Sequence, residues 1–150
     1  MSPQDLEAYL HAHIPQSRAL GVSVLAIGTD GVELAAPLAA NINHRDTVFG
    51  GSASAVAILA AWSLLHVRLS ALGRPSRLVI QRNSMDYLAP MADDFTARSF
   101  IGPDEDWDRF LRMLDRRGVA RITVGAELSC AGVLSGRLSG EFVAFGGDQL

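Results

Sequence analysis

The sequence of 150 residues contains no lysine, so all thirteen basic residues are arginine, and its only cysteine is Cys130. One cysteine can form neither an internal disulfide nor a multi-cysteine metal site, and in ELSCAGVLSG we expect it to be a small buried residue. Charged residues make up only 19%, and a net charge of −3 gives no reason to expect nucleic acid, which a basic face would attract. The spacing of histidines and acids forms no metal site. We therefore expect no cofactor, metal or nucleic-acid partner.

The sequence also lacks a segment typical of secretion or membrane insertion. Its first residues, MSPQDLEAYLHAH, are acidic and helical in pattern, without an apolar signal-peptide core. The most apolar stretch, 52–67, is interrupted by Ser54, Ser63 and His66 and is shorter than the ~20 residues that a membrane-spanning helix needs. We expect a soluble cytoplasmic protein that does not use a membrane.

Apolar residues, in contrast, are abundant, at 49% of the chain. A chain of this length is expected to form one domain with a sizeable core. So much apolar surface beside so little charge predicts an oligomer interface or a ligand tunnel that hides part of it.

The hydrophobic patterns predict a helix, a strand hairpin, a long helix and four further strands. The ranges are 3–13 for the first helix, 21–28 and 32–38 for the hairpin, Gly50 or Gly51 to Leu72 for the long helix, and 76–89, 94–102, 119–129 and 133–145 for the other strands, with a short helix within 103–118. Thr29-Asp30-Gly31 indicates the hairpin turn, because Asp-Gly accepts positive φ angles. The long helix is apolar on all sides and must be surrounded. This predicts an α+β fold in which a curved antiparallel sheet wraps around the helix.

The residues at the start of the long helix, NINHRDTVFGGSASAVAILAAW, resemble the same segment of hot-dog thioesterases. More narrowly, this segment, the WSLLH that follows and MDYLAP on the next strand are similar to the thioesterase-like domain at the carboxyl end of YiiD-type acetyltransferases. The resemblance covers nearly the whole chain. It implies a hot-dog fold of six antiparallel strands around the helix. It also implies a homodimer, or a dimer of dimers, that acts on an acyl-CoA or acyl-carrier-protein thioester.

The glycine pair Gly50-Gly51 suits a site that holds a carbonyl group. The first turn of a helix offers backbone N–H groups without intrahelical partners at the positive end of the helix dipole, and glycine leaves no side chain to keep a ligand away. One such donor in an oxyanion hole typically contributes ~3 kcal/mol. The alternative is that the glycines only allow the loop to pack tightly on the sheet.

The resemblance assigns the donated N–H to Gly50 and the orientation of substrate or water to Asn43. It also reveals two departures: Phe49 stands where many relatives have histidine, and Ile58 where many have a carboxylate. Catalysis therefore does not follow from the fold alone. Further candidate contacts to substrate at the helix start are Phe49, Gly51, Ser52 and Ser54.

Replacement acid–base groups have to come from elsewhere. His44 could titrate near neutral pH or brace the loop, and Asp46 fits a surface turn better than an active site; Thr47 could cap the helix. His11, His13 and His66 are expected at the surface or on helix sides, without a role.

The strand LVIQRNSMDYLAP carries polar groups on both faces. Alternation places Gln81, Asn83, Met85 and Tyr87 on one face and Arg82, Ser84 and Asp86 on the other. In hot-dog dimers this region lies near the subunit interface, so the resemblance makes Asp86 the leading candidate for water activation and Asn83 a polar contact. The alternative is an ion pair of Asp86 with Arg82 or Arg98.

Three functions remain open at this point. The first is an acyl thioesterase that uses Gly50, Asn43 and either Asp86 or His44. The second is a non-catalytic acyl-CoA-binding module, favoured by the missing carboxylate at Ile58. The third, a hydratase or dehydratase, needs a well-placed His/Asp pair on the loop before the long helix, and NHRD could be fitted to that pattern.

Overall fold

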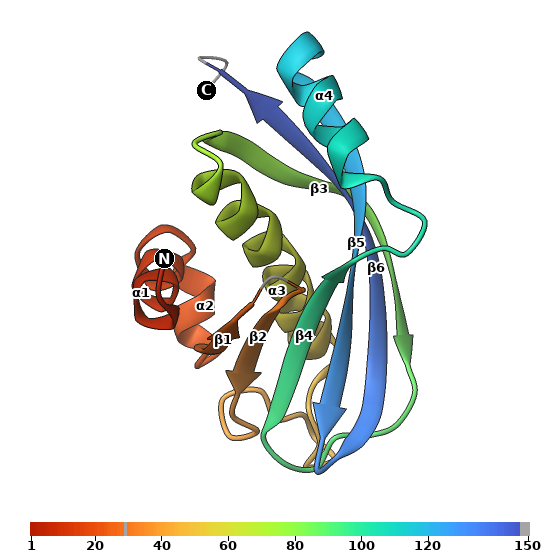
Figure 1. The fold of residues 1–150 in the computed structure, drawn as a ribbon. Coiled ribbons are helices and arrows are strands. Elements are labelled where there is room, and N and C mark those ends of the chain that lie inside the picture. The colour runs from red at the N-terminus through yellow and green to blue at the C-terminus, as the bar shows by residue number, and fades with distance from the viewer. Residues whose placement is uncertain (29, 148–150) are drawn as a thin grey trace.

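The computed structural model of the chain describes residues 1–28 and 30–147 (Figure 1). The elements are α1 (Pro3–His13), α2 (Pro15–Ala19), β1 (Ser23–Ile27), β2 (Val32–Ala36), α3 (Gly50–Ala71), β3 (Ser76–Tyr87), β4 (Phe95–Ile101), α4 (Trp107–Arg117), β5 (Val119–Cys130) and β6 (Val133–Gly146). All predicted helices and strands are present. The five-residue helix α2 was not predicted, because so short a segment has no helical periodicity.

The six strands form one antiparallel sheet in the order β1-β2-β4-β5-β6-β3. The sheet curves around α3, which lies in its concave face (Figure 1). The strands β1 and β3 form the two edges, and Gln81 to Ser84 on β3 are exposed. The predicted curved antiparallel sheet is therefore confirmed.

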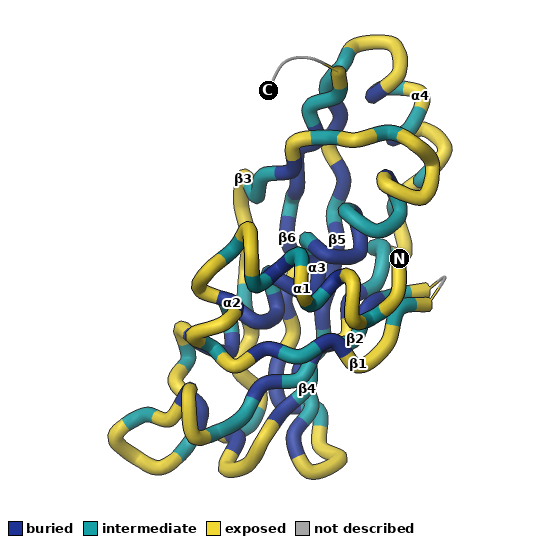
Figure 2. Tube along the Cα trace, turned by 90° about the vertical axis from the view of Figure 1, so that its left-hand side faces the viewer, coloured by how far each residue is buried: buried dark blue, intermediate teal, exposed yellow. Residues whose placement is uncertain are grey.

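Helix α3 forms the centre of the core. Its buried residues are mostly small, which lets the sheet approach closely: Ser52, Ala53, Val56, Ala57, Leu59, Ala60, Ala61, Ser63, Leu64, Leu65 and Leu69. Figure 2 shows buried residues concentrated in α3, β5 and β6. At 22 residues, α3 is long and apolar enough to cross a membrane by length and composition, so the length argument made from residues 52–67 does not hold. Its burial under the sheet accounts for its apolar composition instead.

Helix α4 packs against the carboxyl-terminal end of α3. The Arg68 guanidinium lies over the Trp107 ring, 5.0 Å from its centroid. Arg74, just beyond α3, forms a bidentate ion pair with Asp115, in which its Nε and one Nη each donate to a carboxylate oxygen at 2.9 Å. Gly118, in the left-handed conformation with φ 70°, ends α4, as its position past the helix predicts. The amino-terminal end of α3 lies beside the loop that precedes it and the end of β3.

The hairpin between β1 and β2 forms as predicted, but Gly31 is there for a different reason. Its φ is not positive, and a Cβ on it would collide with the carbonyl oxygen of Ser99 on β4. The amide of Gly28 donates to the Gly31 carbonyl at 2.9 Å. Thr29 of the predicted turn lies outside the described residues.

Candidate functional site

The first turn of α3 has free backbone donors. Phe49 is the N-cap residue, in extended conformation, and no side chain caps the helix. The Ala53 amide donates to the Phe49 carbonyl at 3.0 Å, whereas the amides of Gly50, Gly51 and Ser52 find no acceptor in the part of the chain that the structure describes. Three N–H groups at the positive end of the helix dipole are thus available to a ligand oxygen.

Asn43 holds the loop before α3 together. Its Oδ1 accepts from the amides of Arg45 at 2.8 Å and Thr47 at 3.2 Å, and its Nδ2 donates to the Thr47 hydroxyl at 3.0 Å. Thr47 therefore does not cap α3, and the cap suggested by the sequence is wrong. Within the chain, the Asn43 side chain stabilises the loop. Its role in orienting substrate or water stays a prediction. Asp46 has φ 61° and is a turn residue, as favoured from the sequence.

Asn41 anchors the same loop to the amino-terminal part of the chain, a role that the sequence did not reveal. Its side chain is buried, and Nδ2 donates to the carbonyls of Leu20 and Pro37, both at 2.8 Å. Its own carbonyl accepts from the Phe49 amide at 2.7 Å. The position of the first turn of α3 therefore depends on Asn41.

Aromatic rings of the chain lie against both glycines. A Cβ on Gly50 would lie 3.4 Å from the Tyr87 ring, and one on Gly51 would collide with the Phe49 ring. The Tyr87 hydroxyl also donates to the Gly50 carbonyl at 3.0 Å. The tight-packing explanation thus accounts for part of the glycine pair. It leaves the free amides unexplained.

An apolar cleft of about 320 Å³ opens beside Gly50. Its walls come from the loop, from α3 and from the ends of β3, β5 and β6: Val48, Gly50, Ala53, Tyr87, Leu88, Ala89, Pro90, Met91, Leu128 and Ser135. The Ser135 hydroxyl donates to the Val133 carbonyl at 2.9 Å. Tyr87 is the only titratable residue in this lining, so these walls supply neither a carboxylate nor an imidazole.

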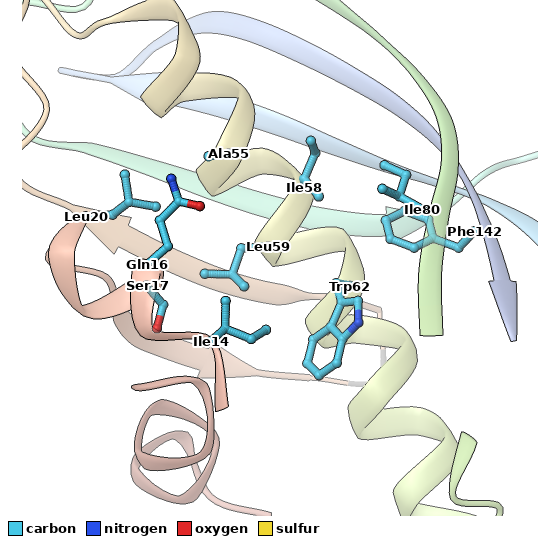
Figure 3. A pocket seen from close by; sticks show the side chains of 10 residues that line it. All are labelled: Ile14, Gln16, Ser17, Leu20, Ala55, Ile58, Leu59, Trp62, Ile80 and Phe142. Carbon is cyan, nitrogen blue, oxygen red and sulfur yellow. The ribbon is translucent and has the colours of Figure 1, made fainter. Parts of the chain in front are cut away.

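A second apolar groove, of about 250 Å³, runs along α3 (Figure 3). It lies between α2, α3 and the strands β3 and β6, and is lined by Ile14, Gln16, Ser17, Leu20, Ala55, Ile58, Leu59, Trp62, Ile80 and Phe142. Gly51, Ala55, Ile58 and Trp62 follow one another at spacings of four, three and four residues, so they share one face of the helix. The face that begins at the free amides therefore continues into this groove. Ile58 is half-buried there and contributes to the apolar lining.

Asp86 does not line the cleft beside Gly50 of its own chain. Asp86 is exposed and lies opposite Arg137 in the strand pairing. Its neighbour Tyr87 packs on Gly50, so Asp86 points to the other face of the sheet. The proposed pairs of Asp86 with Arg82 or Arg98 are absent from the described residues; Arg82 instead approaches Glu141 at 3.9 Å.

The remaining predicted residues are placed as follows. His44 and Asn83 are exposed, Ser52 is buried and Ser54 is half-buried. Gln81 does not share the face of Asn83, because a β-bulge follows Ile80; its Oε1 accepts from Arg121 Nε at 3.0 Å.

His66, half-buried on one side of α3, is part of an aromatic stack. Its ring lies 4.4 Å from that of Tyr9 and 4.9 Å from that of Trp62, and His13 contacts Tyr9 at 4.2 Å. Burial lowers the pKa of His66 below its usual 6.5, and the positive charge of His13 lowers it further. Sixteen residues of helix, about 24 Å, separate His66 from Gly50, so the stack is remote from the free amides.

A curved six-stranded antiparallel sheet around one long helix defines a hot-dog protein, and solved structures similar to this chain share the fold. A protein from Shewanella oneidensis described as a "putative thioesterase" is 25% identical, with a TM-score of 0.84 over 95% of this chain and 96% of that one. A protein of unknown function from Chlorobaculum tepidum is 24% identical, with a TM-score of 0.89 over 96% of each chain. A thioesterase from Haemophilus influenzae is 14% identical, with a TM-score of 0.77 over 97% of this chain and 92% of that one.

The family model described as "Putative thioesterase (yiiD_Cterm)" matches residues 3–146. The chain therefore belongs to the YiiD carboxyl-terminal thioesterase family, which confirms the resemblance seen in its sequence. No curated protein sequence matches it. The family supports thioester hydrolase activity.

Proposed function

We propose that the protein hydrolyses an acyl-CoA or acyl-carrier-protein thioester whose carbonyl oxygen rests on the amides of Gly50 and Gly51. The observation that carries this proposal is the set of three free amides at the start of α3, on a helix face that leads into the apolar groove. The acyl chain lies in that groove along Ala55, Ile58 and Trp62.

In the proposed reaction, water attacks the carbonyl carbon while a base removes one of its protons. The carbonyl oxygen becomes an oxyanion, which the amides at the positive end of the helix dipole stabilise. Collapse of the intermediate breaks the carbon–sulfur bond and releases the carboxylic acid and the thiol of the carrier. Because no carboxylate or imidazole lines the cleft at Gly50, we propose that Asp86 of a second copy, or His44, which is exposed on the loop before α3, supplies the base.

The second copy belongs to a homodimer, or a dimer of dimers, in this proposal. The strand β3 supports it, because this twelve-residue strand is a sheet edge that carries four consecutive exposed residues. An unpaired edge of this length is a ready template for another strand. Sedimentation of the purified protein tests this point: a monomer at micromolar concentration would contradict a site shared between chains.

The activity is tested by detecting free thiol released from a panel of acyl-CoAs and acyl-carrier proteins of increasing chain length. We expect the wild type to release thiol, and loss of a general base to lower kcat by about 10²–10⁴-fold. Asp86→Ala and His44→Ala identify the base, with Asp104→Ala, at an exposed carboxylate before α4, as the matched control. Full activity in both single variants and in their double variant would eliminate these two bases.

A second candidate function is a non-catalytic acyl-CoA-binding module. The observation that favours it is the apolar lining at Gly50 and Ile58, which provides a place for a thioester without a group to activate water. Binding of acyl-CoA without thiol release at any chain length would establish this function and refute the hydrolase.

A further inference from the structure

Tyr87 and the start of α3 meet although 37 residues separate them in the sequence. The Tyr87 side chain is 59% exposed, so burial alone does not fix its ring against Gly50. The fixed contact is the hydrogen bond from its hydroxyl to the Gly50 carbonyl, 3.0 Å long. In an α-helix that begins at Gly50 this carbonyl also accepts an amide from the next turn, so the tyrosine is its second donor.

The Gly50 carbonyl belongs to the same planar peptide unit as the Gly51 amide. A bond to the carbonyl oxygen therefore fixes the direction of the Gly51 N–H. It also draws electron density toward the oxygen, and successive hydrogen bonds polarise one another in this way by an estimated 10–30% per bond. Glycines on both sides of the peptide leave its plane freer to rotate than other residues would, so an external constraint has a larger effect here.

We propose that Tyr87 is a positioning residue that orients and polarises the Gly51 amide as an oxyanion donor. This inference rests on the proposed function and deepens it. Tyr87 itself transfers no proton in this role, and its hydroxyl stays on the Gly50 carbonyl while the substrate oxygen binds at the amide of the same peptide unit.

The expected decrease in kcat follows from the contribution of one oxyanion donor and from the fraction of that contribution that Tyr87 adds by polarisation. Removal of one oxyanion donor typically lowers kcat by 10²–10³-fold. A change of 10–30% in the strength of such a donor therefore corresponds to a decrease of about two- to eightfold. A tyrosine that acted as a catalytic acid or base would cost far more.

The test is Tyr87→Phe, which removes the hydroxyl and keeps the ring on Gly50. Tyr9→Phe is the matched control, because it removes the hydroxyl of the only other tyrosine, which belongs to the remote stack with His66. We expect Tyr87→Phe to lower kcat by about two- to eightfold relative to the control, with KM and Tm unchanged. A kcat equal to that of Tyr9→Phe overturns the inference, as does a loss that falls on KM alone.

A second measurement separates this inference from the proposed function. The Gly51 amide resonance in a ¹⁵N–¹H correlation spectrum reports the polarisation of this peptide unit without any substrate. We expect it to move to lower proton frequency in Tyr87→Phe and to stay in place in Tyr9→Phe. If the wild type hydrolyses no thioester but the Gly51 resonance moves, the proposed function fails and the positioning by Tyr87 stands. An unmoved Gly51 resonance refutes the positioning whatever the activity.

Discussion

Gly50→Ala separates the two explanations of the glycine pair. Gly50 does not have a positive φ, and a Cβ there would lie 3.4–3.6 Å from the Tyr87 ring, which is ordinary van der Waals contact. The fold therefore accommodates alanine. Replacement of glycine by alanine at a compatible position raises the free energy of unfolding by about 0.4–1 kcal/mol, because the unfolded chain loses freedom. For a domain of this size the melting temperature should rise by about 1–4 °C.

Activity should change in the opposite direction. The new methyl group lies on the first turn of α3, beside the amides that the thioester oxygen has to reach. By keeping the thioester oxygen from the Gly50 amide, the methyl group should have the effect of losing one oxyanion donor, a decrease in kcat of about 10²–10³-fold. We therefore expect a more stable and nearly inactive protein. The assay combines thermal unfolding with thiol release, and Gly28→Ala is the control, since among the described residues its Cβ would meet the Gly31 carbonyl alone, at 3.7 Å. Full activity together with raised stability would show that Gly50 serves packing alone.

Two further predictions concern stability. Gly31→Ala should lower the free energy of unfolding by about 1–3 kcal/mol or more, because the Cβ collides with the Ser99 carbonyl and the backbone has to shift; a change below about 0.5 kcal/mol in chemical denaturation would contradict this. Because the pKa of His66 is lower in the folded chain than in the unfolded chain, the unfolded chain takes up the proton first as the pH falls. The contribution of neutral His66 to stability is therefore complete above pH 6.5 and is lost as the pH falls through the lower pKa of the folded state. Melting temperatures between pH 7.5 and pH 5 should therefore fall less in His66→Phe than in the wild type, and equal slopes would count against the burial of His66 as the cause.

The helices and strands could be predicted because their signals are local or periodic. The core helix α3 has apolar residues on every face and no continuous polar stripe, and α4 has an aspartate cap at one end and a left-handed glycine at the other. These features specify an element without reference to its neighbours. The sheet then follows, because a helix of this kind has to be enclosed.

The site could be predicted only in part, because its geometry depends on contacts between distant segments. The glycine pair predicted free amides, and the structure has them. The sequence did not show that Tyr87 lies on Gly50, that Asn41 ties the loop to Leu20 and Pro37, or that Gly31 is required by Ser99. Each of these contacts joins residues that only the folded sheet brings together.

The central claim, that a thioester carbonyl rests at the start of α3, is tested most directly by a crystal structure with a non-hydrolysable acyl-CoA analogue. The account predicts the carbonyl oxygen about 2.7–3.1 Å from the amide nitrogen of Gly50 or Gly51, with the acyl chain in the groove beside Ile58 and Trp62. A carbonyl oxygen bound away from these amides, with the first turn of α3 still unoccupied, would contradict it.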